Sequence, residues 1–284
     1  MIKPIGLING HYECRSFKQT VPILTDLLAL EVVDETHGEI TVKHPNTDWR
    51  LIFHEGGPNA PDKPLRNHYG LRVATNGEVE KADEYLERKK DEFHIEIMKP
   101  RNHHLARSVH FFEPGGNWWE IESYELAVKA GLGANVLPHW QTALPEERFP
   151  GRGYIPQALT HGTIECFDLE ISRRFYREVL GLDVVSPSPS VKPHYVKHPS
   201  TPWYIVALQP PASERKILGP RQRFTLALGS VSAVEEAHRW LKESGKEAGI
   251  TELTDLKDGD EAVSFLLSDP DRNWWEVSSP ASLQ

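Results

Sequence analysis

The sequence contains little cysteine and no long apolar run, and each absence excludes a class of protein. Only Cys14 and Cys166 stand among 284 residues. They are too few for a disulfide framework, so a reducing compartment is expected. No apolar stretch approaches the roughly 20 residues of a membrane-spanning helix, and the opening Met-Ile-Lys-Pro lacks the apolar core of a signal peptide. We therefore expect a cytoplasmic protein with no membrane partner.

Positive charge is also in short supply, with 32 basic against 41 acidic residues and a net charge of −9. This balance argues against a nucleic-acid partner, because little would neutralise a phosphate backbone. Glycine-rich phosphate loops of the GxxxxGK[ST] or GxGxxG type and a GxSxG elbow are missing, which disfavours nucleotide hydrolysis and serine-hydrolase chemistry. Histidine and tryptophan, by contrast, are plentiful, with 14 and 8 residues.

Four motifs occur twice in the same order, which identifies an internal duplication. NGHYEC ends at Cys14 and HGTIEC at Cys166, 152 residues apart. EPGGNWWE ends at Glu120 and DPDRNWWE at Glu276, 156 residues apart. Between them, VKHPNTDW pairs with VKHPSTPW and EVEKADEYL with AVEEAHRWL at offsets of 154 and 155. The chain therefore consists of two similar halves.

Each half divides again into two units whose patterns predict a strand, a helix and three further strands. In DLEISRRFYREVLGL, apolar residues recur at helical spacing and Gly181 ends the helix. Ser232 and Glu235 are spaced as the capping box of another helix. We number these β-α-β-β-β units 1 to 4 and place them at about 5–57, 64–124, 158–212 and 219–280. The expected organisation is a first half at 1–124, a linker rich in Gly, Pro and Ala at 125–157, and a second half at 158–284.

The segments HGTIECFDLEISRRFYREVLGL and FFEPGGNWWEIE, set in four such units, resemble the vicinal oxygen chelate superfamily. That superfamily includes glyoxalase I, bleomycin-resistance proteins and extradiol ring-cleaving dioxygenases. The resemblance covers the whole chain apart from the linker. It implies an α+β fold in which the units pair into two cupped mixed sheets, with a divalent metal in a cup. In the ring cleavers, two histidines and one glutamate hold iron or manganese.

Carried onto this sequence, the resemblance implies metal ligands at specific positions. Glu120 and Glu276 occupy the motif glutamate, and His68 fits the histidine that opens unit 2. The repeat partner of His68 is Arg223, which cannot ligate a metal because it stays protonated. Unit 4 therefore lacks a ligand.

The remaining histidine depends on how the units pair. His161 stands at the family position in unit 3, and its counterpart in unit 1 is Asn9. His11 shares a strand face with Asn9 but lies roughly 6–7 Å further along. Pairing in sequence order completes a site with His68 and Glu120 only if a bulge brings His11 in. Crossed pairing of unit 2 with unit 3 gives His161, His68 and Glu120. The candidate ligands are thus His68, Glu120 and one of His161 or His11.

The resemblance also implies acid–base groups in the stretch before the glutamate. His103, His104 and His110 lie there, and we take His110 and His103 as the candidate catalytic residues. Aromatic candidates for the substrate walls are Trp118, Trp119, Trp203 and Tyr195.

These features favour a dioxygenase acting on a small aromatic substrate, catechol-like or hydroquinone-like, with dioxygen. Fe(II) is the expected metal, with Mn(II), Ni(II) or Zn(II) as alternatives, and a homo-oligomer is compatible with the sequence. A glyoxalase-like lyase or isomerase is the second hypothesis, and it needs a fourth ligand from His54, Glu55 or Gln209. A third is a non-catalytic binding protein of the bleomycin-resistance type.

Overall fold

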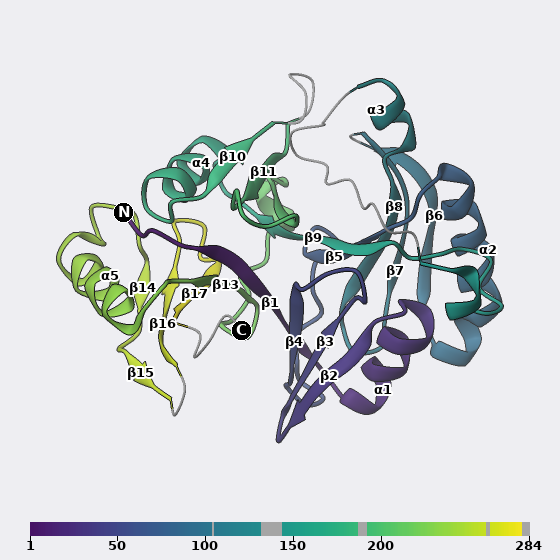
Figure 1. The fold of residues 1–284 in the computed structure, drawn as a ribbon, viewed down its shortest axis with the longest axis horizontal. Coiled ribbons are helices and arrows are strands. Elements are labelled where there is room, and N and C mark those ends of the chain that lie inside the picture. The colour runs from purple at the N-terminus through teal and green to yellow at the C-terminus, as the bar shows by residue number, and fades with distance from the viewer. Residues whose placement is uncertain (104, 132–143, 187–191, 260–261, 280–284) are drawn as a thin grey trace.

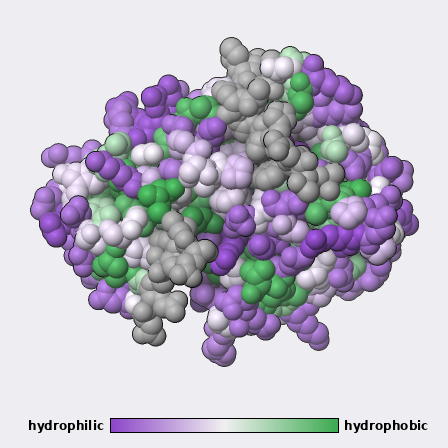
Figure 2. Space-filling view, viewed as in Figure 1, coloured by the Kyte–Doolittle hydropathy of each residue, from purple (hydrophilic) through white to green (hydrophobic). Residues whose placement is uncertain are grey.

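The computed structural model describes residues 1–103, 105–131, 144–186, 192–259 and 262–279. Its strands form two large mixed sheets, and helices α2 and α5 lie at opposite ends of the molecule (Figure 1). The expected α+β class with two cupped mixed sheets is confirmed. Within these ranges, no helix combines the length and apolar character that crossing a lipid bilayer requires. On the face seen in Figure 2, hydrophilic residues dominate and hydrophobic residues form small separate patches.

The first half contains two β-α-β-β-β units, as the patterns predict. Unit 1 has, in order, β1 (Gly6–Cys14), α1 (Phe17–Pro22), the π-helical turn η1 (Ile23–Leu27), β2 (Glu31–Thr36), β3 (Glu39–Lys43) and β4 (Arg50–Glu55). Unit 2 has β5 (His68–Arg72), α2 (Asn76–Phe93), β6 (Glu96–His103), β7 (Ala106–Phe112) and β8 (Trp118–Ser123). The described part of the linker holds α3 (Glu125–Lys129) and the 3₁₀ turn η2 (Glu146–Arg148).

The second half repeats this order, except that the strand after the helix of unit 4 is split into two short strands. Unit 3 has β9 (Ala158–Glu165), α4 (Leu169–Glu178), β10 (Asp183–Val185), β11 (His194–Lys197), β12 (Tyr204–Leu208) and the 3₁₀ turn η3 (Ala212–Glu214). Unit 4 has β13 (Arg223–Ala227), α5 (Val231–Ser244), β14 (Glu252–Leu253), β15 (Lys257–Asp258), β16 (Val263–Ser268) and β17 (Trp274–Ser278).

The units pair in the crossed manner. Strand β1 pairs antiparallel with β13, which joins units 1 and 4 in the order β14-β16-β17-β13-β1-β4-β3-β2, with β15 also on β16. Strand β5 pairs antiparallel with β9, which joins units 2 and 3 in the order β10-β11-β12-β9-β5-β8-β7-β6. We call these the 1/4 sheet and the 2/3 sheet. Each sheet takes one unit from each half of the duplication.

Aromatic side chains fill the core between the two sheets. The Tyr69 ring lies 4.5 Å from the Tyr12 ring and 5.9 Å from the Phe224 ring, centroid to centroid. Gly10 and Gly162 make this possible, because a Cβ atom on either would come within 2.8 Å of these rings. Aromatic pairs of this kind add roughly 0.5–1.5 kcal/mol beyond their area burial. The close approach therefore ties the two sheets into one structure.

Strand alternation places one tryptophan of each WW pair in this core. Trp119 and Trp275 are fully buried, whereas Trp118 and Trp274 are half-buried. The capping box predicted from Ser232 and Glu235 for α5 is wrong. The N-cap is Ser230, whose hydroxyl accepts a hydrogen bond from the Ala233 N–H at 3.2 Å.

Candidate metal centre

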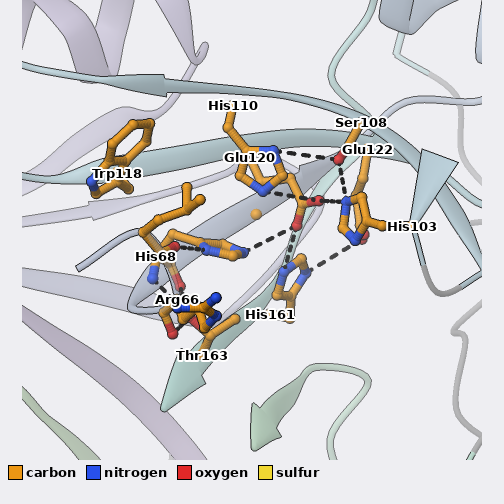
Figure 3. A network of polar contacts seen from close by, with 12 residues as sticks. Arg66, His68, His103, Ser108, His110, Trp118, Glu120, Glu122, His161 and Thr163 are labelled. Carbon is orange, nitrogen blue, oxygen red and sulfur yellow. Dashed lines mark hydrogen bonds and ion pairs between the residues drawn. The ribbon is translucent and has the colours of Figure 1, made fainter. Parts of the chain in front are cut away.

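Four histidines surround the carboxylate of Glu120 on the 2/3 sheet, as Figure 3 shows. The Nε2 atoms of His68 and His161 lie 3.2 and 3.1 Å from Glu120 Oε2. Those of His103 and His110 lie 3.0 and 3.4 Å from Glu120 Oε1. Glu120 and His161 are each 2% exposed, so water does not satisfy this carboxylate. We call these five residues the 2/3 site.

Adjacent strands bring these side chains together although they are far apart in sequence. Glu120 on β8 stands opposite Gly70 of the parallel strand β5, and His161 on β9 stands opposite the same Gly70 from the other side. His110 on β7 is the cross-strand partner of Glu120. His68 is two residues from Gly70 and therefore points to the same face.

Gly70 leaves the space that the His161 ring occupies. A Cβ atom at this position would lie 2.1 Å from His161 Cε1 and 2.7 Å from both ring nitrogens. Ordinary contacts of a Cβ atom begin near 3.4 Å. Any other residue at this position would thus displace the imidazole from Glu120.

Contacts on the far side of two rings orient their free nitrogens toward Glu120. His68 Nδ1 lies 2.7 Å from the Leu65 carbonyl, which can only accept, so Nδ1 carries a proton and Nε2 is the nitrogen left to bind either a proton or a metal. His161 Nδ1 lies 3.3 Å from Glu122 Oε1, which favours the same tautomer. Two imidazole nitrogens and one carboxylate oxygen thus converge, and either protons or a bound cation must lie between them.

This donor set fits a divalent metal. The ligand atoms of His68, Glu120 and His161 all lie within 4.8 Å of one another. Two imidazoles and one carboxylate form the facial set typical of non-haem iron sites, and a carboxylate or carbonyl behind each histidine is typical of metal-bound imidazoles. A second group, His103, His110 and Glu120, shares the same carboxylate.

The electrostatics of the 2/3 site show how strongly Glu120 requires positive charge. Burial opposes ionisation, yet the surrounding histidines hold the pKa of Glu120 well below its usual range. Burial disfavours the imidazolium of His161, but Glu122 and Glu120 outweigh it and raise the pKa to about 9. Burial lowers the pKa of His110 to about 3. A bound divalent cation would supply the charge that protons otherwise supply, with release of those protons.

A buried ion pair supports His161 from behind. Glu122 is 1% exposed and lies 2.8 Å from the Arg72 guanidinium, which also donates to the Tyr204 hydroxyl at 3.1 Å. Arg72 stacks 4.4 Å above the Tyr124 ring. Removing one partner of such a pair leaves a buried charge without compensation, so Glu122 stays in place as an acceptor for His161.

Sequence reasoning did not identify Gly70, Arg72 or Glu122. The signal for Glu122 was present: it stands two residues after Glu120 on the same strand and therefore shares its face. His104, the third histidine of the stretch before Glu120, lies outside the described residues.

A cavity of about 880 Å³ opens in front of the 2/3 site and reaches His68, His103 and His110. Its remaining walls are aliphatic and cationic side chains with one glutamine, namely Leu65, Arg66, Arg101, Leu169, Lys192, Pro193, Leu208, Gln209, Pro210, Pro211 and Arg215. The four aromatic residues expected as walls are not among these described lining residues. Trp119 and Trp203 are buried in the core between the sheets instead, with Trp203 stacked on Trp49.

The 1/4 sheet holds a different cluster, which we call the 1/4 site. His11 lies here and not beside His68: its Nε2 is 3.3 Å from Glu276 Oε2, and its Nδ1 is 3.0 Å from His54 Nε2. Arg223 Nε donates to the same Glu276 oxygen at 3.0 Å, and the Thr225 hydroxyl donates to it at 3.1 Å. Burial would raise the pKa of Glu276, but His11 and Arg223 hold it far below its usual range. A guanidinium therefore supplies the positive charge in this site.

None of the residues considered as a fourth ligand belongs to the ion-holding groups around Glu120. His54 belongs to the 1/4 site, and Glu55 accepts a hydrogen bond from the Phe17 N–H at 2.9 Å. Gln209 bonds to the backbone of Phe167 at 3.0 Å, at the cavity wall. Among the described residues, the two side-chain groups able to hold an ion both contain Glu120.

Comparison with known proteins agrees with this architecture. A structure of a candidate dioxygenase from Bacillus subtilis subsp. subtilis str. 168 aligns with a TM-score of 0.64 at 12% identity, over 99% of this chain and 86% of that one. Glyoxalase I from Zea mays aligns with a TM-score of 0.65 at 14% identity, over 96% of this chain and 92% of that one. At such identities the likeness concerns the fold. No curated protein matches the chain in sequence.

A family model carries the assignment further than these structures do. It matches residues 14–121 and 158–277, one stretch in each half and together well over half of the chain. The matches include Glu120 and His161 as well as Glu276. The chain thus belongs to the Glyoxalase/Bleomycin resistance protein/Dioxygenase superfamily.

Proposed function

We propose that this protein is a metal-dependent dioxygenase that opens a catechol-like or hydroquinone-like ring. The observation that supports this most is the composition of the 2/3 site. His68, His161 and Glu120 form a three-residue group able to hold a divalent ion, and His103 and His110 stand beside the same carboxylate. His68, His103 and His110 face one cavity, so one proposed ligand and both proposed proton-transfer groups line the same space.

Three protein ligands suit the chemistry of ring cleavage. His68, His161 and Glu120 would hold Fe(II), or failing that Mn(II), which when bound would supply the redox chemistry between ring and dioxygen. In the overall reaction, both atoms of dioxygen enter the product, one ring carbon–carbon bond breaks, and no external reductant is consumed. The four-ligand set of a glyoxalase-like lyase has less support, because His54 and Glu55 lie elsewhere and Gln209, at the cavity wall, bonds to the Phe167 backbone.

In this proposal the protein residues orient the ring and move protons. His110 and His103 face the cavity, where they would accept protons from the two substrate hydroxyls. The Ser108 hydroxyl contacts both rings, so a proton taken by one histidine has a path to the other. Aliphatic walls of leucine and proline exclude water from the ring.

Metal analysis of protein purified without oxygen, followed by oxygen uptake on a panel of catechols and hydroquinones, tests the proposal. We expect about one iron per chain and one dioxygen consumed per ring opened. Nickel or zinc with no oxygen uptake would transfer support to the lyase. Protein that binds the aromatic compounds with no metal at all would indicate a binding protein. The variant His68→Ala is expected to lose the metal, and full retention would refute the assigned site.

A further inference from the structure

The cavity in front of the 2/3 site has a charge opposite to that of the whole chain. Four cationic residues, Arg66, Arg101, Lys192 and Arg215, line it, and no aspartate or glutamate is among the described lining residues. The chain as a whole carries a net charge of −9. Charge of one sign that is concentrated in a cleft focuses the electrostatic field there and attracts ligands of the opposite charge.

Three of these cations form no ion pair with any carboxylate that the structure describes, although Arg215 lies near enough to Glu165 to oppose the rise that burial causes in the pKa of that carboxyl. Arg66 is paired, since its Nη1 lies 2.5 Å from Glu214 Oε2. In the part of the chain that the structure describes, no carboxylate lies within ion-pair distance of Arg101, Lys192 or Arg215. The cavity wall thus keeps a surplus of positive charge.

Arg215 is held in place, which distinguishes it from an ordinary surface arginine. Its Nε donates to the Pro210 carbonyl at 3.0 Å, and its guanidinium stacks 4.8 Å above the Phe167 ring. These contacts restrict the side chain while leaving its terminal N–H groups available, because no acceptor for them is found among the described residues. A guanidinium fixed in this way binds a carboxylate at a lower entropic cost.

Arg101 connects this charge to the reactive end of the cavity. It lies on β6 two residues before His103, and side chains two apart on a strand share a face. Both residues line the same cavity. A substrate with its ring at His103 and His110 therefore has cationic side chains within reach of its substituent.

The rest of the cavity suits the apolar part of the same molecule. Its aliphatic walls include Leu65, Leu169 and Leu208 together with three prolines. At about 880 Å³ it lies near the upper end of the range for small-molecule sites, and a bare benzenediol fills only part of it.

We infer that the substrate is an aromatic diol with a carboxylate-bearing substituent, which Arg215 and Arg101 bind while the ring lies at the 2/3 site. The position of the ring rests on the proposed function, whereas the anion preference rests on the cavity wall alone. Guanidinium groups bind carboxylates through paired charge-assisted hydrogen bonds, which gives both affinity and orientation.

Calorimetric binding to the full-length protein loaded with Zn(II), which is redox-inert, tests this inference without turnover. The probes are 3,4-dihydroxyphenylacetate and its methyl ester, which differ in the charge and by one methyl group. We expect the acid to bind at least about tenfold more tightly than the ester at low salt, with a ratio that falls as ionic strength rises. Arg215→Gln and Arg101→Gln should each reduce the ratio several-fold. Lys242→Gln, which removes an exposed cation on α5 of the other sheet, should leave it unchanged.

Equal binding of acid and ester, or a ratio unchanged in both arginine variants, would overturn the inference. Tighter binding of 4-sulfocatechol than of the acid would overturn the carboxylate assignment. The same comparison on metal-free protein separates the two proposals. A preference for the acid that persists there, with no oxygen uptake by the iron-loaded protein, keeps the anion site and refutes the dioxygenase. Equal oxygen uptake on acid and ester keeps the dioxygenase and refutes the anion site.

Discussion

Replacing Gly70 with alanine tests the geometry of the 2/3 site with the smallest possible change. The new methyl group would lie 2.1 Å from His161 Cε1, against an ordinary contact of 3.4 Å, so the ring must retreat by about 1.3 Å. Metal sites tolerate roughly 0.2 Å in ligand distance. We therefore expect Gly70→Ala to weaken metal binding by at least about 10- to 100-fold, the loss usual for disturbed ligand orientation.

The assay is titration of the metal-free protein with Fe(II) or Zn(II) against a competing chelator, together with thermal unfolding. Gly10→Ala is the matched control, because its methyl group would lie 2.2 Å from the Tyr69 hydroxyl without touching His161. Both variants overpack the core and should lose about 1–3 kcal/mol of stability. Only Gly70→Ala should lose metal affinity. Wild-type affinity in that variant, or equal loss in the control, would refute the reasoning.

Three further predictions concern other residues. His161→Ala should abolish tight metal binding, whereas His11→Ala should not. Metal content per chain measures the difference, and a loss of metal only in His11→Ala would contradict the crossed site. His110→Gln should lower kcat by about 10²- to 10⁴-fold with metal retained, the range for a lost proton-transfer group, and unchanged kcat would exclude that role. Burial raises the pKa of Glu113 from 4.5 to about 7, so its protonated form stabilises the folded state below pH 4.5 and this stability is lost as pH rises to 7. Glu113→Gln should therefore flatten the pH dependence of unfolding between pH 4.5 and 7 by on the order of 3 kcal/mol, and an unchanged slope in denaturant titrations would contradict this.

Much of the fold could be predicted because the signals were local and occurred twice. The apolar spacing of 168–182 predicted a helix, and α4 spans Leu169–Glu178 with Asp168 as its N-cap. The WW pairs alternate between core and surface as strand geometry requires. The cap of α5 was placed wrongly because GSVS offers two serines, and the structure selects Ser230 by its extended backbone and its hydrogen bond from the Ala233 N–H.

The pairing of units could not be predicted, since it is a tertiary property that no local pattern encodes. Both His11 and His161 stand on first strands after similar motifs, and the 125–157 segment is compatible with either arrangement. The contacts that accompany crossed pairing are long-range: Gly10 with Tyr69, and Gly162 with Tyr69 and Phe224. Such complementarity between strands of different units becomes visible only in three dimensions.

A comparison of the two sites explains why the 2/3 site is a candidate for metal and the 1/4 site is not. Several positions differ together between the two sheets: His68, Gly70, His110 and Glu122 correspond by repeat offset to Arg223, Thr225, Leu266 and Ser278. In the 1/4 site the Arg223 guanidinium neutralises Glu276. Thr225, whose hydroxyl donates to Glu276, stands where the 2/3 site has Gly70. Ser278 stands where the 2/3 site has Glu122, the acceptor behind His161. Leu266 stands where it has His110, the proposed proton-transfer group. Since Arg223 and His11 compensate the charge of the buried Glu276, the 1/4 site has no need of a metal, and the chemistry proposed for this protein belongs to the 2/3 site.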